Sequence, residues 1–159
     1  MNSSVPGRLD RYLKEAQAML AEREARWRRA KRMKFDTLAV HGLYTMEEAI
    51  TKNQGAIIEP LFLASAQAYR DSDELEAALS YQIPTWCYTR IHNPTLGYLE
   101  DTLALLETYG SDIRAGCCVY SSGMAAIENV TDTLLVRLGD EPPNFVSQCQ
   151  IYGGTFQQF

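Results

Sequence analysis

From Arg8 to Lys34 the chain runs without a proline or a glycine, and this stretch limits its fold more than any other. Apolar residues recur there at the three- and four-residue spacing of one helical face, at Leu9, Tyr12, Leu13, Ala16, Met19 and Leu20, and more weakly through Arg23, Trp27 and Ala30. The pattern predicts one long amphipathic helix. Its late basic run, Arg26 to Lys34, suits the negative end of a helix dipole.

The charge of the chain changes sign near Lys34. Residues 1–34 hold ten Lys/Arg and four Asp/Glu, a net charge of +6, whereas the remainder holds five and sixteen, a net charge of −11. A basic helix can bind nucleic acid or a membrane surface, but we favour a solvated helix that packs its apolar face on the body or on another subunit. We therefore define residues 1–34 as a basic helical extension and expect neither a nucleic acid nor a membrane as partner.

Composition excludes several classes of protein. Of the 159 residues 46% are hydrophobic and 22% are charged, which allows a packed core and argues against wholesale disorder. No apolar run approaches the roughly 18 residues that span a bilayer. Met1 to Pro6 lacks the basic and apolar succession of a secretory signal, so we expect a cytoplasmic protein.

The cysteines do not have the spacing of a metal site. Cys87, Cys117, Cys118 and Cys149 include no C-x-x-C pair, and the chain has only two histidines, His41 and His92. Because structural zinc sites usually pair their ligands at short spacing, we predict no metal and expect buried, reduced thiols.

The segment 35–97 is predicted to be irregular. Five glycines and prolines divide it into short apolar runs, namely Gly42, Gly55, Pro60, Pro84 and Pro94. Short helices are predicted over Met46–Lys52 and Ser72–Tyr81, the second with Ser72 as its N-cap. The segment is typical of an arm and not of a self-contained core.

Beyond Thr95 helices and strands are predicted to alternate. Leu99–Tyr109 should form a helix with Leu99, Leu103 and Leu106 on one face and Gly110 as its stop, and a second helix should run from Met124 to Leu138 and end at Gly139-Asp140. The apolar runs Ala115–Tyr120 and Asn144–Ser147 suit buried strands. We therefore predict an α/β domain over 98–159, an incomplete, mostly parallel sheet flanked by helices.

Ser122, Gly123 and Met124 lie where the first predicted strand runs into a helix. Backbone amides at a helix N-terminus bind anions, and glycine lets a ligand approach the backbone closely. An ordinary helix capped by Ser122 explains the same residues.

Two further groups could contact a ligand. Arg90, next but one to Tyr88, has the planar fork that suits phosphate or carboxylate, with a surface ion pair as the alternative. Tyr152 follows a predicted strand and precedes Gly153-Gly154, so its ring could cover a flat ligand, with a simple Gly-Gly turn as the alternative.

Taken together and in this order, these groups resemble a known family. The matching stretches are Thr37–Gly42, Gln54–Pro60, Tyr88-x-Arg90 with Asn93–Thr95 and Leu99-Glu100, Ser122–Ala126, Leu138–Asp140 and Tyr152–Thr155. From about Phe35 to Phe159 the chain is similar to the Cys/Met-metabolism (trans-sulfuration) enzymes that depend on pyridoxal 5′-phosphate (PLP). This family includes cystathionine γ-synthase and γ-lyase, methionine γ-lyase and O-acetylhomoserine sulfhydrylase.

The resemblance implies a fold and a role for each residue. The fold would be the N-terminal part of fold-type-I PLP-dependent transferases, with 35–97 as an arm that contacts a neighbouring subunit. Gly123 and Met124, with Ser122, would bind the PLP phosphate, and Tyr152 would stack on the ring and assist proton transfer. Tyr88 and Arg90 would reach the phosphate of the neighbouring subunit's PLP. The complete protein would be a dimer of dimers that acts on a small amino-acid substrate, as a Cβ/Cγ–S lyase or an O-acyl-homoserine transferase.

One part of the resemblance is missing. PLP enzymes hold the cofactor through a lysine, and the family's lysine follows Ser-x-[Ser/Thr] beyond the position of Tyr152. Here the lysines are Lys14, Lys31, Lys34 and Lys52, none in that context. We therefore expect an N-terminal fragment that is inactive alone, with a non-catalytic oligomerisation module derived from the same fold as the alternative. A second departure lies just before Tyr88, where this chain has Trp86-Cys87 and members of the family commonly have a glycine-rich stretch.

Overall fold

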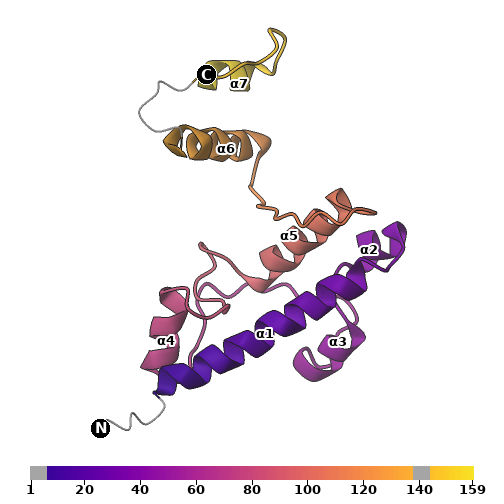
Figure 1. Ribbon diagram of the computed structural model, residues 1–159, viewed down its shortest axis with the longest axis vertical. Helices are drawn as coiled ribbons and strands as arrows, with labels where there is room; N and C mark the ends of the chain where they lie inside the picture. Colours follow the sequence, from indigo (N-terminus) through magenta and orange to yellow (C-terminus); the bar gives the residue numbers. More distant parts are fainter. Residues whose placement is uncertain (1–6, 138–143) are drawn as a thin grey trace. The chain divides into compact units, whose positions relative to one another are not determined.

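The computed structural model describes residues 7–137 and 144–159, and within them the chain is helical (Figure 1). The helices are α1 (Arg8–Ala30), α2 (Phe35–His41), α3 (Met46–Lys52), α4 (Ser72–Leu79), α5 (Pro94–Glu107), α6 (Gly123–Arg137) and α7 (Gly153–Gln158). The chain divides into two compact units, the first ending at Cys117 and the second running from Cys118 to Phe159. Met1–Pro6 and the predicted stop at Gly139-Asp140 lie outside the described residues.

Helix α1 confirms the long helix predicted from the sequence. It begins at Arg8, where the Gly7 amide donates a 3.0 Å hydrogen bond to the Asp10 carboxylate. It ends at Ala30, before the expected Lys34, because the chain tightens into a turn in which the Met33 amide bonds to the Ala30 carbonyl at 3.0 Å.

Two hydrophobic clusters contact the two ends of α1. Near its start, Tyr12 and Ala16 pack with Ala77 and Ala78 of α4 and with Ile83. Near its end, Trp27 and Ala30 pack with Leu38 of α2, with Leu43 of the loop between α2 and α3, and with Ala104 and Leu105 of α5. The midpoint of the predicted stripe is left uncovered, so Met19 and Leu20 are 46% and 51% exposed.

The segment 35–97 is more helical than its sequence predicts. The helix over Met46–Lys52 is confirmed, but α2 was expected to be irregular. Burial of Leu38 in the cluster under α1 stabilises this short helix, which tertiary contacts can do where local propensity is weak. The N-cap of α4 is Asp71 and not Ser72, because the Asp71 carboxylate accepts a 2.9 Å hydrogen bond from the Glu74 amide.

Helix α5 begins earlier than predicted and buries a different face. Asn93 caps it by accepting a 3.0 Å hydrogen bond from the Leu96 amide, and Pro94 takes the first helical position, where a missing N–H costs nothing. Gly97, Ala104 and Leu105 are buried, whereas Leu99 is 44% exposed. The buried face is centred on Ala104 and Leu105, which pack with Trp27 and Leu38, and Leu106 of the predicted face packs at its edge.

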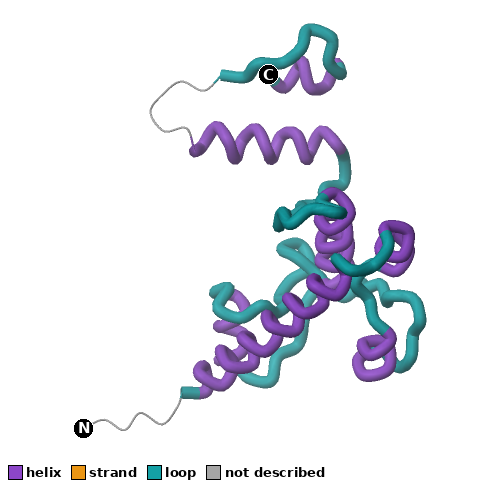
Figure 2. The backbone as a smooth tube through the Cα atoms, turned by 45° about the vertical axis from the view of Figure 1, so that its right-hand side comes forward, coloured by secondary structure: helices purple, strands orange, loops and turns teal. Residues whose placement is uncertain are grey.

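The predicted sheet is not present in the part of the chain that the structure describes. Residues 115–120 and 144–147 are not assigned to a strand, and Figure 2 draws no strand in the described part of the chain. A strand is stabilised by the neighbour that completes its hydrogen bonds, and an apolar run alone does not supply one. The only bridge among the described residues joins Ala66 and Tyr88, antiparallel and isolated. Helix α6 confirms the helix predicted from Met124.

None of the helices within residues 7–137 and 144–159 is long and apolar enough to cross a membrane.

Candidate functional site

The first turn of α6 presents backbone amides to an open space. The Ser122 hydroxyl accepts a 3.2 Å hydrogen bond from the Ala125 amide, and the Ser122 carbonyl accepts one of 3.2 Å from Ala126. The amides of Gly123 and Met124 have no partner within the helix, because the first turn has no preceding carbonyls to bond. A Cβ added at Gly123 would meet nothing within 4 Å, so a ligand can approach. Ser122 is therefore a cap, and it leaves two amides free for an anion.

Tyr152 lies close to this turn within the second unit. A Cβ added at Gly154 would lie 2.7 Å from Cε1 of the Tyr152 ring and 3.3 Å from the Met124 sulfur. Thr155 contacts the same sulfur at 3.5 Å through its hydroxyl. The fold thus brings an aromatic ring, 74% exposed, beside the first turn of α6, and only a glycine at position 154 fits between them.

Tyr88 and Arg90 lie in the first unit, on the segment between α4 and α5. The Arg90 guanidinium carbon is 5.3 Å from the centre of the Tyr88 ring, a cation–π contact. The Tyr88 ring is 40% exposed, and Arg90 forms no ion pair with any described residue. The alternative of a surface ion pair is therefore not found among the described side chains, and the guanidinium is available to an external anion.

The backbone around Tyr88 is held on both sides. The Thr89 amide donates to the Ser65 carbonyl at 3.0 Å, and the Thr89 hydroxyl donates to the carbonyl of Ala64. The amides of Ile91 and His92 both bond to the Tyr88 carbonyl, at 2.9 and 3.0 Å. The loop therefore presents Tyr88 and Arg90 from a defined turn.

The Trp86 side chain packs against the residues that follow this turn. Its ring lies 4.9 Å from the His92 ring, and a Cβ added at Gly97 would lie 2.6 Å from its Cη2 atom. His92 in turn lies 3.4 Å from the Glu100 carboxylate. Trp86 thus packs where α5 begins.

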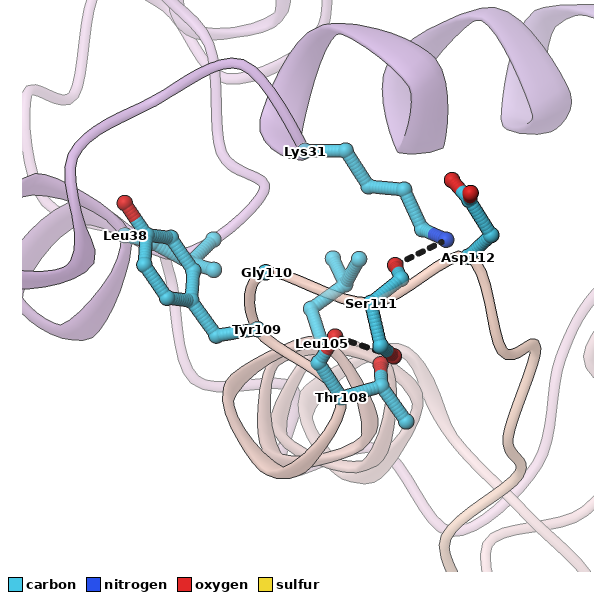
Figure 3. A pocket seen from close by; sticks show the side chains of 8 residues that line it. All are labelled: Lys31, Leu38, Leu105, Thr108, Tyr109, Gly110, Ser111 and Asp112. Atoms are coloured by element: carbon cyan, nitrogen blue, oxygen red, sulfur yellow. Dashed lines mark hydrogen bonds between the residues drawn. The ribbon is translucent and has the colours of Figure 1, made fainter.

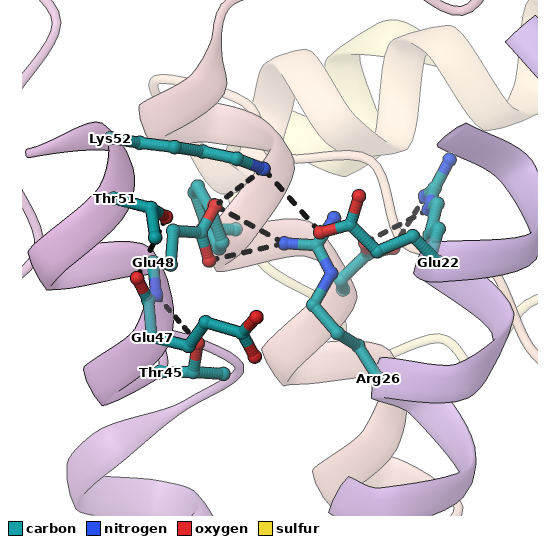
Figure 4. A network of polar contacts seen from close by, with 10 residues as sticks. Glu22, Arg26, Thr45, Glu47, Glu48, Thr51 and Lys52 are labelled. Atoms are coloured by element: carbon teal, nitrogen blue, oxygen red, sulfur yellow. Dashed lines mark hydrogen bonds and ion pairs between the residues drawn. The ribbon is translucent and has the colours of Figure 1, made fainter. Parts of the chain in front are cut away.

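A half-buried polar network joins α1, α3 and α5 (Figure 4), and the sequence did not predict it. Arg26 of α1 bonds to Glu48 of α3 at 3.3 Å and to the Tyr98 hydroxyl of α5 at 3.2 Å, while Tyr98 donates to Glu48. Lys52 reaches Glu22 at 3.4 Å. The only sequence signal was indirect, since Arg26 lies one residue before the buried Trp27.

Burial changes the proton affinities in this network. Burial and the hydrogen bond to Glu48 raise the pKa of Tyr98 above 10.0. Burial alone would lower the pKa of Arg26, but Glu48 and Tyr98 outweigh it and the pKa is raised. Burial, with Glu48 nearby, raises the pKa of Glu59 to about 7, and one Glu59 oxygen is buried without a hydrogen-bond partner among the described residues.

Two hollows in the first unit lie outside the predicted site. One, of about 180 Å³, lies between the end of α1 and the end of α5 (Figure 3), and Lys31 crosses its rim to donate to the carbonyls of Ser111 and Ile113 at 3.4 Å. The other, of about 500 Å³, is the groove between α1 and α3 beside the polar network. Neither contains a residue that the sequence singled out as binding a cofactor.

The cysteines correct one expectation. None of the four cysteines forms a disulfide within the described residues, but Cys118 and Cys149 are exposed and Cys87 and Cys117 are only partly buried. The expected burial of Cys118 and Cys149 is wrong because the described part of the second unit buries no apolar side chain that could form a core around them.

The site residues thus form two groups on different units. Ser122, Gly123, Met124 and Tyr152 lie together on the second unit, and Tyr88 lies with Arg90 on the first.

Comparisons with known proteins agree with the motifs. The family model described as Cys/Met metabolism PLP-dependent enzyme matches residues 36–159. The chain is 36% identical over 125 residues to a homocysteine/cysteine synthase of Kluyveromyces lactis, and the matched stretch covers 79% of this chain and 26% of that protein. It is 35% identical over 122 residues to an L-methionine gamma-lyase of Pseudomonas deceptionensis, covering 77% and 27%. No solved structure matches the chain significantly.

The chain therefore belongs to the Cys/Met-metabolism family of PLP-dependent enzymes, whose fold is fold type I and whose cofactor is PLP. It spans about a quarter of the length of the curated relatives it matches.

Proposed function

We propose that this chain supplies the phosphate-binding and ring-stacking part of a PLP site in sulfur amino-acid metabolism. The observation that carries the proposal is the packing of Tyr152 beside the first turn of α6, with Gly154 between the ring and Met124. A flat cofactor with a phosphate needs an aromatic face and a set of hydrogen-bond donors close together, and these residues provide both.

Each residue would have a definite task. The amides of Gly123 and Met124 would donate to phosphate oxygens, and the Ser122 hydroxyl would hold that turn in place. The Tyr152 ring would cover the cofactor ring, and its exposed hydroxyl could hold a proton near a bound amino acid. PLP, when bound, withdraws electrons from such an amino acid.

Tyr88 and Arg90 would complete the site of a neighbouring protomer. The unpaired guanidinium of Arg90 and the open face of Tyr88 support this proposal. An arm of residues 35–97 would form the contact, because its segment 57–63 exposes four apolar side chains by 73–91%, those of Ile57, Ile58, Leu61 and Leu63. The complete protein would then be a homo-oligomer, a dimer of dimers.

The whole protein would act on a sulfur amino acid or an O-acyl homoserine, by elimination or replacement at its β or γ carbon. The printed names of the matched relatives, a homocysteine/cysteine synthase and a methionine gamma-lyase, support this class of reaction. The four cysteines, which form no disulfide within the described residues, suit the reducing cytoplasm.

The lysines of this chain suit other roles. Lys31 caps carbonyls and Lys52 pairs with Glu22, and every lysine precedes α6 in the sequence. The chain should therefore bind PLP without a covalent link.

Equilibrium dialysis of PLP and of pyridoxal, which lacks the phosphate, tests the proposal. We expect Arg90→Ala to weaken PLP binding roughly tenfold to a hundredfold and to leave pyridoxal binding unchanged. Tyr152→Ala should weaken both ligands, whereas Tyr152→Phe, which keeps the ring, should retain them. Equal affinity of the unaltered chain for PLP and pyridoxal would overturn the proposal.

Mixing two variants separates a shared site from a local one. If Arg90 serves the neighbour, an equal mixture of Arg90→Ala and Tyr152→Ala chains forms mixed dimers with one intact site each. Roughly a quarter of all sites should then bind PLP with full affinity. If the mixture binds no better than its two components, Arg90 does not act across a subunit boundary.

A further inference from the structure

We infer that α1, which precedes the region matched by the family model, is a brace that holds the Tyr88–Arg90 segment in its binding position. The inference rests on the proposed function, because it assigns Arg90 the task of binding phosphate. It gives the basic extension a role that neither the family match nor the motifs supply.

The first contact of the brace is near the start of α1. The Tyr12 hydroxyl donates a 2.6 Å hydrogen bond to Asp71, the N-cap of α4, and Tyr12 itself is 2% exposed. Glu15 accepts a 2.7 Å bond from Arg70. These contacts connect α1 to the residues at which α4 begins.

The same end of α1 also reaches the segment before Tyr88. The cluster around Tyr12 contains Ile83, with Cys87 packed against it. Tyr69, packed against the same cluster, donates a 3.0 Å hydrogen bond to the carbonyl of Trp86. The chain immediately before Tyr88 therefore packs on α1 through the apolar contacts of the Tyr12 cluster, and the part-buried hydrogen bond from Tyr69 also holds it.

The second contact is one third of the way from the end of α1, on α5. Arg23 binds Asp101 with both arms of its fork, at 2.6 and 3.2 Å. One turn later Arg26 bonds to Tyr98, and Trp27 packs with Ala104 and Leu105. Helix α5 starts at Pro94, directly after the segment that carries Tyr88 and Arg90.

One continuous helix thus fixes both ends of the segment between α4 and α5. An α-helix is a stiff rod, so contacts at Tyr12 and Arg23 set the separation of α4 and α5. Arg90 forms no hydrogen bond or ion pair with the described residues of α1, so Tyr12 and Arg23 are positioning residues that act on it through the chain between α4 and α5. Figure 1 shows α1 running past α4 and α5.

Hydrogen exchange of the full chain tests the brace without any cofactor. The double variant Tyr12→Phe/Arg23→Ala removes one polar contact at each end, that of Tyr12 with Asp71 and that of Arg23 with Asp101, and keeps the apolar ring at position 12. The amides of Thr89, Ile91 and His92 should exchange roughly fivefold to tenfold faster in this variant. Arg28→Ala is the matched control, because Arg28 pairs at 3.4 Å with Glu24 of the same helix and its loss should leave these amides unchanged.

Coupling to Arg90 separates positioning from a general loss of structure. The double variant should weaken PLP binding several-fold when Arg90 is present and have no effect in an Arg90→Ala background. An equal loss in both backgrounds, or unchanged exchange at Thr89, overturns the brace.

The two proposals fail in different ways. If Arg90→Ala leaves PLP affinity intact, the proposed function fails, and the exchange experiment still decides whether α1 holds the segment. If the double variant does not fold, Arg23→Ala alone provides the test, because its side chain is 52% exposed.

Discussion

The two units of this chain differ in how many of their apolar side chains are buried. In the first, twelve apolar side chains between Tyr12 and Leu105 are buried, and α1 contributes to both clusters. In the described part of the second unit, Thr131 is the only buried residue, and Val130, Leu134 and Val146 are 53–97% exposed. The Tyr88–Arg90 segment therefore lies on a packed body, whereas the first turn of α6 and Tyr152 lie on helices that share few apolar contacts.

The difference teaches where binding precision comes from in this molecule. A packed body holds a side chain in one position before a ligand arrives, which lowers the cost of binding. A unit without its own core depends on whatever covers its exposed apolar side chains. The arm should therefore be ordered without cofactor, and the α6 turn should gain order when the cofactor or a covering surface binds.

The largest difference in the free energy of unfolding should appear when a leucine is changed to alanine in each unit. Leu38→Ala removes a side chain that is 0% exposed and should lower the free energy of unfolding of the first unit by about 2–5 kcal/mol. Leu134→Ala, at a side chain that is 53% exposed, should change stability by less than about 0.5 kcal/mol. Urea unfolding followed by tryptophan fluorescence measures the first unit, where both tryptophans lie, and far-UV circular dichroism, which all the helices contribute to, also measures the second. Similar losses from the two substitutions would erase the contrast.

Stability should also depend on pH through Glu59 of the first unit. Its pKa is raised from 4.5 to about 7, so the folded state binds a proton that the unfolded state releases. Stability is therefore fully present below pH 4.5 and declines as the pH rises to about 7. Because the carboxyl is only partly buried, we discount the full shift and expect a loss of about 2 kcal/mol.

Glu59→Gln isolates this contribution from other titrating groups. The variant should be more stable than the unaltered chain at pH 8 and equal to it at pH 4, measured by urea unfolding at each pH. An unchanged pH profile would show that Glu59 is solvated and not held against Glu48.

The smallest expected effect comes from the helix caps. Asn93→Ala removes a cap that is 7% exposed and should destabilise the first unit by about 1 kcal/mol. Ser122→Ala removes the cap of α6, which is exposed, and should cost less in global stability because water can replace the hydroxyl. Chemical shifts of Leu96 and Ala125 amides report each cap locally. A larger global loss for Ser122→Ala would mean that α6 belongs to a cooperative core.

Local signals in the sequence predicted the helices well and the sheet badly. Helical spacing, an uninterrupted run and capping residues act within a few residues, so α1, α3, α4 and α6 could be predicted. The strands at 115–120 and 144–147 depend on partners distant in sequence, and the apolar runs alone do not specify them. Helix α2 was missed for the same reason, because Leu38 is stabilised by Trp27 and Leu105 and not by its neighbours in the chain.

The site was predictable to the extent that its motifs are contiguous. Ser122, Gly123 and Met124 form one turn, and Tyr88 with Arg90 forms another, so each pair of neighbours could be assigned from sequence. The placement of Gly154 between Tyr152 and Met124, and the network of Arg26, Glu48 and Tyr98, join residues that no local pattern connects. Their discovery required the fold.

The contact between Trp86 and Gly97 has a consequence for how this protein can vary. The Trp86 ring occupies the space that any side chain at position 97 would need, since a Cβ there would lie 2.6 Å from the ring. A larger residue at 97 is tolerable only if position 86 shrinks with it. In a library randomised at both positions and selected for folding, we expect the two to co-vary, tryptophan appearing with glycine and smaller residues with alanine or serine.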